Sequence, residues 1–264
     1  MTPAAVSLSD VCVSYSSSTG RETVAVRDIS FEVARAEFLT LIGPSGCGKS
    51  TLLNVICGLQ RLTSGSVRVN GAEVRGPLPD VVGVVFQDYT LFPWRSVLKN
   101  VEIGLEFRGM AARERRQRAE HYLEMVGLAE FAGHLPRELS GGMKQRVAIA
   151  RALSLEPEVL LMDEPFGALD EQTRMVLGEQ LSSILEQTGK TIVFVTHSLA
   201  EAAYLSDRIL VMTSRPGRLK ATINVPLSHP RKPELMLGDD FNDLRNQLFS
   251  LLHDEIVRAA EIVE

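Results

Sequence analysis

Short runs of β-branched and other apolar residues recur along the chain and predict strands. Most are bounded by polar or turn residues, which is the pattern of strands with at least one buried face. The runs occupy Val6–Tyr15, Val24–Val33, Phe38–Ile42, Ser66–Val69, Val81–Phe86, Val159–Met162, Thr191–Thr196, Arg208–Thr213 and Ala221–Val225. The early strands follow one another without helices between them, so we expect an antiparallel β layer there.

Apolar residues at helical spacing predict helices between several of these strands. They are expected at Lys49–Leu59, Ser96–Phe107, Ala112–Val126, Gly141–Ser154, Glu171–Glu186 and Leu199–Leu205. Strands that alternate with helices indicate an α/β fold with a mainly parallel sheet. Residues from about 88 to 156 carry helix patterns and no strand pattern, so we predict a helical insertion between two core strands.

A final amphipathic pattern runs from Asp239 to Glu264. Its apolar face carries Phe241, Leu244, Leu248, Leu251 and Leu252. We interpret it as a helix packed on the core, with a second dimer contact as the alternative. The predicted organisation is a main domain over residues 1–225 and a C-terminal helical extension over residues 226–264.

The composition is that of an ordinary soluble globular protein. Hydrophobic residues make up 45% and charged residues 23% of the 264, which are usual values for this class. The net charge of −5 provides no basic excess, so nucleic acid is not an expected partner. Arginines cluster at residues 113–118, and we interpret this stretch as a solvated helix face because glutamates are interleaved with it.

Cysteine usage and hydropathy indicate the cellular compartment in which we expect the protein. The three cysteines, Cys12, Cys47 and Cys57, form no CxxC pair, which disfavours a disulfide framework or zinc site and favours reduced thiols in the cytosol. The first residues lack the pattern of a signal peptide. No run approaches the roughly 18 apolar residues needed to span a bilayer. We therefore expect any membrane role to depend on a partner.

The strand predicted at Phe38–Ile42 runs into the sequence GPSGCGKS and then into a helix. This GxxxxGK[ST] pattern makes a nest of backbone N–H groups at a helix N-terminus, where phosphate oxygens bind. A lysine in this position gives a point charge to the β/γ-phosphates, and the next hydroxyl ligates Mg²⁺. The predicted nucleoside triphosphate contacts are Gly43, Pro44, Ser45, Gly46, Cys47, Gly48, Lys49, Ser50 and Thr51.

Two carboxylates follow the apolar run Val159–Met162. A buried strand there delivers Asp163 to the Mg²⁺ shell, and Glu164 can polarise a water in line with the γ-phosphate as general base. The alternative is a strand end with ordinary acids. His197 follows the next strand, where ligands bind in open α/β sheets, so we expect it to contact the γ-phosphate.

The stretch Leu139–Arg146, LSGGMKQR, resembles the LSGGQ signature of the ATP-binding subunits of ABC transporters, with Met143 in the glutamine place. It precedes an apolar helix, so Ser140, Gly141 and Gly142 form a second anion-binding helix N-terminus. The resemblance implies the ABC ATPase fold and a head-to-tail dimer. In that dimer each ATP lies between the phosphate loop of one subunit and the signature of the other.

The resemblance covers about residues 6–225 and implies further roles. Tyr15 lies where the family stacks an aromatic ring on adenine. Gln87 matches the glutamine that reaches Mg²⁺ and the attacking water, and residues 167–170 resemble the loop at the dimer interface. Glu164 matches the catalytic base and His197 the switch histidine. ATP and Mg²⁺ are thus the implied cofactors, and hydrolysis of ATP would open a dimer that ATP had closed.

The block Leu91–Arg95 contains the only tryptophan of the chain. An aromatic–arginine cluster suits a protein–protein interface, and in the family this region receives a membrane-embedded permease. We expect docking near Phe92, Pro93 and Trp94. The alternative is that Phe92 and Trp94 fix the insertion to the core.

Together with Thr213–Arg218, this block looks most like the importer branch for nitrate, sulfonate and taurine-type solutes. The resemblance implies an extracytoplasmic solute-binding protein and a peripheral location on the cytoplasmic face of the inner membrane. An exporter ATPase, or a soluble ABC machine that acts without a permease, is the alternative.

Overall fold

The structure is a computed structural model that describes residues 4–16 and 22–261. Its contacts divide the chain into two compact units. The first unit comprises Met1–Leu78 and Thr191–Glu264, and the second comprises Pro79–Lys190.

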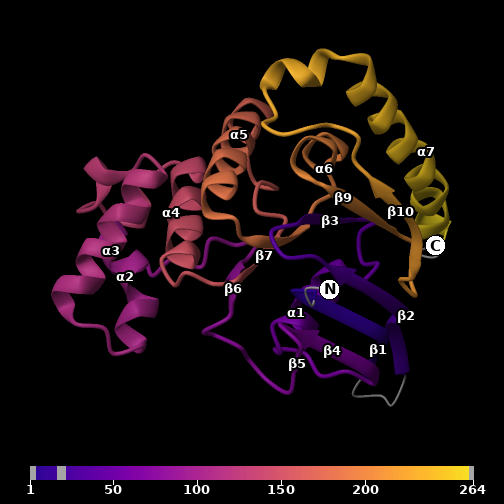
Figure 1. The fold of residues 1–264 in the computed structure, drawn as a ribbon, viewed down its shortest axis with the longest axis horizontal. Helices are drawn as coiled ribbons and strands as arrows, with labels where there is room; N and C mark the ends of the chain where they lie inside the picture. Colours follow the sequence, from indigo (N-terminus) through magenta and orange to yellow (C-terminus); the bar gives the residue numbers. More distant parts are fainter. Residues whose placement is uncertain (1–3, 17–21, 262–264) are drawn as a thin grey trace. The chain divides into compact units, whose positions relative to one another are not determined.

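An antiparallel sheet opens the first unit (Figure 1). Its strands are β1 (Val6–Ser16), β2 (Glu22–Val33), β4 (Ser64–Val69) and β5 (Ala72–Glu73), in the order β2-β1-β4-β5. Val6, Leu8, Val11 and Val13 of β1 are buried, so one face of this sheet packs on a core. The expected antiparallel layer is confirmed. The short strand β5 was not expected, because two exposed residues carry no periodicity.

A second group of strands in the first unit is mainly parallel. It contains β3 (Phe38–Ile42), β8 (Thr191–Val195), β9 (Arg208–Met212) and β10 (Leu219–Asn224). Strand β3 pairs in parallel with β8 on one side and with β9 on the other, and β10 is antiparallel to β9. All residues of β3 and β8 are buried, as continuous apolar runs in parallel sheets are.

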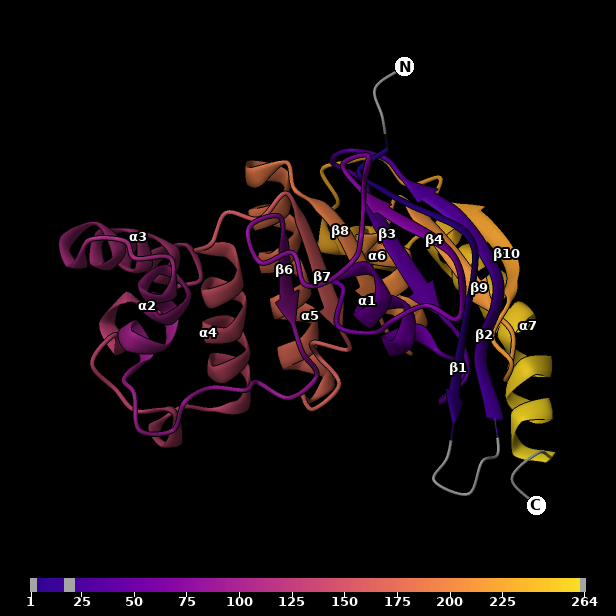
Figure 2. The ribbon, with the colours of Figure 1, turned by 90° about the horizontal axis from the view of Figure 1, so that it is seen from below.

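Helices cover these strands. Helix α1 (Lys49–Ile56) contacts β2 and β4 of the antiparallel sheet and also β8, so it lies between the two groups of strands (Figure 2). Helix α1 is three residues shorter than expected. Gly58 turns the chain with φ 78°, at a point where any Cβ would lie 2.0 Å from the carbonyl oxygen of Gly76.

The C-terminal part of the first unit carries α6 (Leu199–Leu205), a 3₁₀ turn η3 (Pro233–Leu237) and α7 (Asp239–Glu261). Helix α7 contacts α6 and β9. Its buried residues are Phe241, Leu244, Leu248, Leu252 and Glu255. The interpretation as a helix packed on the core is confirmed. Residues 262–264 of the predicted helix lie outside the described residues.

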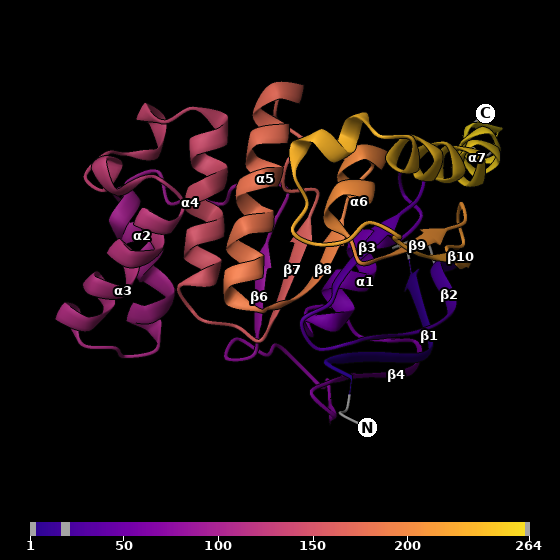
Figure 3. The ribbon, with the colours of Figure 1, turned by 45° about the horizontal axis from the view of Figure 1, so that its top comes forward.

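The second unit begins with β6 (Val82–Val85), which pairs in parallel with β7 (Val159–Asp163). Between the two strands lie α2 (Val97–Phe107), α3 (Ala112–Met125), the 3₁₀ turns η1 (Ala129–Phe131) and η2 (Pro136–Glu138), and α4 (Gly141–Leu153). Helices α2, α3 and α4 contact one another (Figure 3). Helix α5 (Glu171–Thr188) follows β7 and contacts α4. The expected helical stretch between two parallel strands is confirmed.

Among the residues that the structure describes, no helix is both long and apolar enough to span a bilayer.

Candidate functional site

The predicted phosphate loop, Gly43–Thr51, follows β3 and includes the first three residues of α1. Gly48 occupies the N-cap position of α1 with φ 102°, and a Cβ there would lie 2.3 Å from Cγ1 of Val26. A glycine N-cap has no side chain to bond the first N–H groups, and the first turn of α1 holds no acidic residue. The helix start therefore directs its first N–H groups and the positive end of the helix dipole toward a bound anion.

Lys49 lies inside this loop. Its side chain is almost fully buried, and its Nζ donates hydrogen bonds to the carbonyl oxygens of Gly43 at 2.9 Å and Pro44 at 3.0 Å. These two carbonyl groups hold the ammonium group against the loop. A phosphate bound to the loop would thus meet a positive charge that is already in position.

Two more residues of the first unit lie beside the loop. The hydroxyl of Tyr15 is 3.2 Å from that of Thr51, and the Tyr15 residue is 43% exposed, so its ring is available for stacking. Burial raises the pKa of the Cys47 thiol, although Lys49 lowers it by a smaller amount. The thiol therefore stays protonated and takes no nucleophilic role.

His197 lies at the same edge of the parallel strands as the phosphate loop. In the register of β3 with β8, Leu41 pairs with Val195. Gly43 and His197 each come two residues later, and both follow the carboxyl ends of their strands. The side chain of His197 is exposed there. His197 therefore lies at the edge where ligands bind in open α/β sheets, and its contact with the γ-phosphate stays a prediction.

The second unit brings Gln87 and Glu164 together. Gln87 comes two residues after β6, and its Nε2 donates to Oε2 of Glu164 at 3.5 Å. Glu164 follows Asp163, the last residue of β7, with φ 43°. This left-handed conformation is strained for a residue with a side chain, and such strain gathers at functional positions. A carboxylate with an amide beside it can orient and deprotonate a water.

The signature segment, residues 139–146, forms the start of α4. Ser140 is the N-cap, and its Oγ accepts a hydrogen bond from the N–H of Met143 at 3.3 Å. A Cβ on Gly141 would lie 3.1 Å from the hydroxyl oxygen of Tyr89, and one on Gly142 would lie 2.8 Å from Cγ2 of Thr173. The two glycines therefore let the helix start approach its neighbours closely.

A hollow of about 350 Å³ lies beside this helix start. Its lining includes Ser140, Gly142, Arg146, Gln172, Thr173 and Gln180. The neighbouring Asp170 accepts hydrogen bonds from the backbone N–H of Thr173 at 3.0 Å and from its hydroxyl at 2.7 Å. These bonds lower the pKa of Asp170. Asp170 thereby fixes the start of α5 next to the hollow.

The predicted site residues are divided between the two compact units of the chain. The first unit contains Tyr15, the phosphate loop and His197, whereas the second contains Gln87, Asp163, Glu164 and the signature segment. Among the described residues, no group of three or more His, Cys, Asp or Glu side chains is arranged to hold a metal ion.

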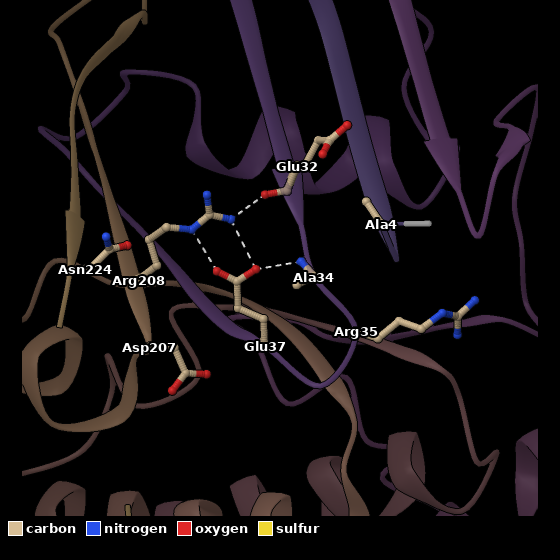
Figure 4. Close-up of a pocket in the computed structure, with 8 residues that line it drawn as sticks. All are labelled: Ala4, Glu32, Ala34, Arg35, Glu37, Asp207, Arg208 and Asn224. Atoms are coloured by element: carbon tan, nitrogen blue, oxygen red, sulfur yellow. Dashed lines mark hydrogen bonds and ion pairs between the residues drawn. The ribbon is translucent and has the colours of Figure 1, made fainter. Parts of the chain in front are cut away.

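A cavity of about 770 Å³ lies elsewhere in the first unit, at the amino ends of β3 and β9 (Figure 4). Arg208 crosses it. Its Nε is 2.7 Å from Oε1 of Glu37, and its Nη2 donates to the carbonyl oxygen of Glu32. The guanidinium group of Arg208 is thus bonded to the Glu37 carboxylate and the Glu32 carbonyl oxygen, and these bonds link the ends of neighbouring strands. We therefore do not consider this cavity a phosphate-binding site.

Sequence reasoning missed two residues that fix the loop from 87 to 96. Asn100 is fully buried; its amide nitrogen donates to the carbonyl oxygens of Phe92, Arg95 and Ser96. Arg151 of α4 donates to the carbonyl oxygens of Tyr89 and Thr90. A polar Asn100 within an apolar helix pattern was the available signal.

Two aromatic residues of this loop, Phe92 and Trp94, contact each other. Trp94 is 73% exposed, so it does not fix the helices to a core. The ring of Phe92, a half-buried residue, meets the Trp94 ring edge-on at a centroid distance of 5.7 Å.

Comparisons with known proteins identify the family of this chain. A family model described as ABC transporter matches residues 26–167. A taurine import ATP-binding protein, TauB of Rhizobium johnstonii, is 45% identical over 255 residues, which are 94% of this chain and 97% of that protein. An uncharacterized ABC transporter ATP-binding protein of Methanocaldococcus jannaschii is 50% identical over 240 residues, 91% of this chain and 88% of that protein.

Solved structures of ABC transporter cassettes also resemble this chain. The dimeric structure of MJ0796, a bacterial ABC transporter cassette, matches with a TM-score of 0.75 and 35% identity, over 84% of this chain and 100% of that chain. A post-hydrolysis state of the same cassette, bound to ADP and Pi, matches equally well. The chain belongs to the ABC transporter family, and it is an ATP-binding subunit with the ABC ATPase fold. The expected resemblance and the ATPase class are confirmed.

Proposed function

We propose that this chain is the ATP-hydrolysing subunit of an importer for nitrate, a sulfonate, taurine or a related small solute. The observation that carries ATP binding is the phosphate loop, in which Lys49 is already held by two carbonyl oxygens. The importer assignment is supported by relatives named for taurine import and for nitrate import. Such names favour import over export and over a soluble ABC machine.

In the proposed organisation, residues 1–225 form the nucleotide-binding domain, with the helical insertion at about 88–156. Residues 226–264 form a C-terminal extension. The N–H groups of the phosphate loop and Lys49 bind the β- and γ-phosphates, and Tyr15 stacks on the adenine.

The donor set fits Mg²⁺. Ser50, Gln87 and Asp163 offer hydroxyl, amide and carboxylate oxygens, which are the ligands that Mg²⁺ prefers. Mg²⁺ bound with ATP would neutralise charge on the phosphates.

Glu164 acts as the general base of hydrolysis. It accepts a proton from the attacking water as the water oxygen bonds to the γ-phosphorus, and the bond to the bridging oxygen breaks to leave ADP and phosphate. Gln87, whose amide already donates to Glu164, orients the water. His197 contacts the γ-phosphate and reports its departure.

A second copy of the chain completes the site. Ser140 and the amide groups of Gly141 and Gly142 present a helix N-terminus, which suits the γ-phosphate of an ATP held by the other copy. ATP then joins two copies head to tail, and hydrolysis lets them separate. This two-state change is the step that a transporter can use.

The half-buried Phe92 and the exposed Trp94, with Pro93 between them, are the proposed docking site for permease subunits. A partly exposed aromatic cluster is the usual centre of such an interface. Asn100 fixes the backbone around it, and Arg151 links the preceding residues to the signature helix α4. The full complex would include an extracytoplasmic solute-binding protein, and this subunit would lie peripherally on the cytoplasmic face of the membrane.

The test is recovery of the permease from native membranes. A tagged Glu164→Gln chain, held with ATP, should co-purify with a polytopic membrane protein identified by mass spectrometry. Because Trp94 is exposed, Trp94→Ala in the same background should fold normally and recover much less of that protein. Recovery of ribosomes or DNA, or equal recovery by both chains, would contradict the proposal.

A further inference from the structure

One loop packs against the phosphate loop. This bracing loop, Thr213–Arg218, joins β9 to β10. The Arg215 side chain donates from Nε to the carbonyl oxygen of Gly46 at 3.3 Å. A Cβ on Gly217 would lie 2.0 Å from the carbonyl oxygen of Cys47. The bracing loop thus contacts two successive peptide groups of the phosphate loop.

The bracing loop is itself fixed on two sides. Gly217 exchanges two backbone hydrogen bonds with β2, one to the carbonyl oxygen of Ala25 and one from the N–H of Arg27, both at 2.9 Å. Within the loop, the hydroxyl of Thr213 accepts from the N–H of Arg218 at 3.0 Å and donates to the carbonyl oxygen of Pro216 at 3.2 Å. The contacts on the phosphate loop therefore come from an ordered support.

Glu255 of helix α7 contacts the bracing loop at Ser214 and the following strand β10 at Lys220. The residue is 2% exposed. Its Oε2 accepts a hydrogen bond from the N–H of Ser214 at 3.0 Å, and its Oε1 lies 3.0 Å from Nζ of Lys220. Burial raises the pKa of Glu255, but the bonds from Ser214 and Lys220 outweigh it, so the pKa lies below its usual value. The carboxylate is charged, buried and directed at the bracing loop.

We infer that Arg215 and Glu255 are positioning residues for ATP, and that helix α7 sets nucleotide affinity through them. The inference rests on the proposed role of the phosphate loop. Glycine-rich loops lose more conformational entropy than others when they become ordered. A support that orders the loop before ATP arrives reduces this loss on binding. Without the support, the N–H groups would be aimed less accurately at the phosphates.

The experiment compares nucleotide binding by full-length variants. Arg215→Ala should raise the Kd for ATP about tenfold, as expected from loss of one charged hydrogen bond. Arg215→Lys should restore part of the affinity. Glu255→Gln, which keeps the shape of the side chain and removes its charge, should raise the Kd about threefold, within the range for a weakened hydrogen bond. The KM for ATP should rise in parallel, while kcat changes by less than about twofold, because uniform binding is what is lost.

Matched controls separate positioning from general stability. Arg218→Ala removes a guanidinium of the same loop that pairs with exposed Asp28, and Asp254→Asn removes an exposed carboxylate next to Glu255. Both should leave the Kd unchanged. The Kd for AMP, which lacks the β- and γ-phosphates, should not change in any variant.

The inference can fail in two ways, because either the bracing role or the phosphate site itself can be wrong. The ATP affinity of Lys49→Ala distinguishes the two. If Lys49→Ala weakens ATP binding but Arg215→Ala and Glu255→Gln do not, the bracing role is wrong. The same holds if the variants only lower the thermal unfolding midpoint. If Lys49→Ala itself leaves ATP binding unchanged, the proposed phosphate site is wrong and the inference falls with it.

Discussion

The phosphate loop and the signature segment are both glycine-rich helix starts, and they differ in what completes them. Neither α1 nor α4 has an acidic residue in its first turn. Lys49 is buried against the carbonyl oxygens of the phosphate loop. Ser140 instead uses its hydroxyl to cap its own helix, and it is exposed. The first helix start has a cation and a support of its own, whereas the second is an exposed helix end, and we propose that its anion comes from another copy of the chain.

The difference teaches that an anion-binding helix start can have two roles. A buried lysine and a braced backbone suit a site that binds ATP in a single chain. An exposed cap and a shallow hollow suit a site that acts only when another molecule brings the phosphate. The following changes test that distinction, in order of decreasing effect.

Glu164→Gln should have the largest effect. A general base contributes about 10²- to 10⁴-fold to a rate, so phosphate release should fall by roughly that factor while the Kd for ATP is retained. Both helix starts would then stay occupied, and the dimer should accumulate. Glu124→Gln, an exposed residue of α3, is the control. A native rate of phosphate release from Glu164→Gln would show that another group is the base.

Lys49→Ala should weaken ATP binding about 100-fold, since hydrogen bonds to charged groups contribute about 1.5–3 kcal/mol. Titration calorimetry on the single chain would measure it. The variant also removes the ammonium group from the Gly43 and Pro44 carbonyl oxygens, so its fold should be checked by circular dichroism. A folded variant with native affinity would contradict the role of the phosphate loop.

Ser140→Ala should leave ATP binding to the single chain unchanged. The lost N-cap should cost about 1 kcal/mol of stability, the usual value for such caps, and urea unfolding would measure it. In the Glu164→Gln background the ATP-dependent dimer should weaken. If instead the single chain lost ATP affinity, the two helix starts would be parts of one site within one copy.

The smallest effect concerns pH. The pKa of Glu255 is lower in the folded chain than its usual value, because Ser214 and Lys220 bind its charged form. Its contribution to stability is complete above the usual carboxyl pKa of 4.5 and is lost as the pH falls through the lower, folded value. The difference in unfolding free energy between the native chain and Glu255→Gln should therefore shrink below about pH 4.5. A difference that stays constant from pH 7 to pH 3 would contradict the assigned ion pair.

Local patterns made much of this structure predictable. The strand–loop–helix from Phe38 to Ile56 depends on adjacent residues, and the strand β3 was expected at its observed bounds. The resemblance related both Gln87 and Glu164 to the attacking water, but no local pattern predicted the contact between them, because the two residues are 77 positions apart. The contact of Arg215 with Gly46 spans 169 positions. No periodicity or local motif encodes pairings of that kind.

The arginine-rich stretch shows the same limit within one helix. Arg116 pairs with Glu120 at 2.8 Å on an exposed face of α3, as helical spacing predicts. Arg115 instead reaches buried Glu102 of α2 at 3.6 Å. Arg118 is also half-buried and pairs with Glu156 at 3.4 Å. The expectation of a solvated face is therefore met at Arg113 and Arg116 and fails at Arg115 and Arg118, where packing against other elements decides.

Complementation between two variants tests most directly the claim that the two helix starts act in different copies. One chain would carry Lys49→Ala and the other Ser140→Ala, both with Glu164→Gln, and ATP-dependent dimers would be measured by analytical ultracentrifugation. In a homodimer of either variant, each ATP site combines one substituted helix start with one intact helix start. In the mixture, one site of the heterodimer combines two intact halves. The account predicts more dimer in the mixture than in either variant alone. A mixture with no more dimer than the average of the two would contradict it.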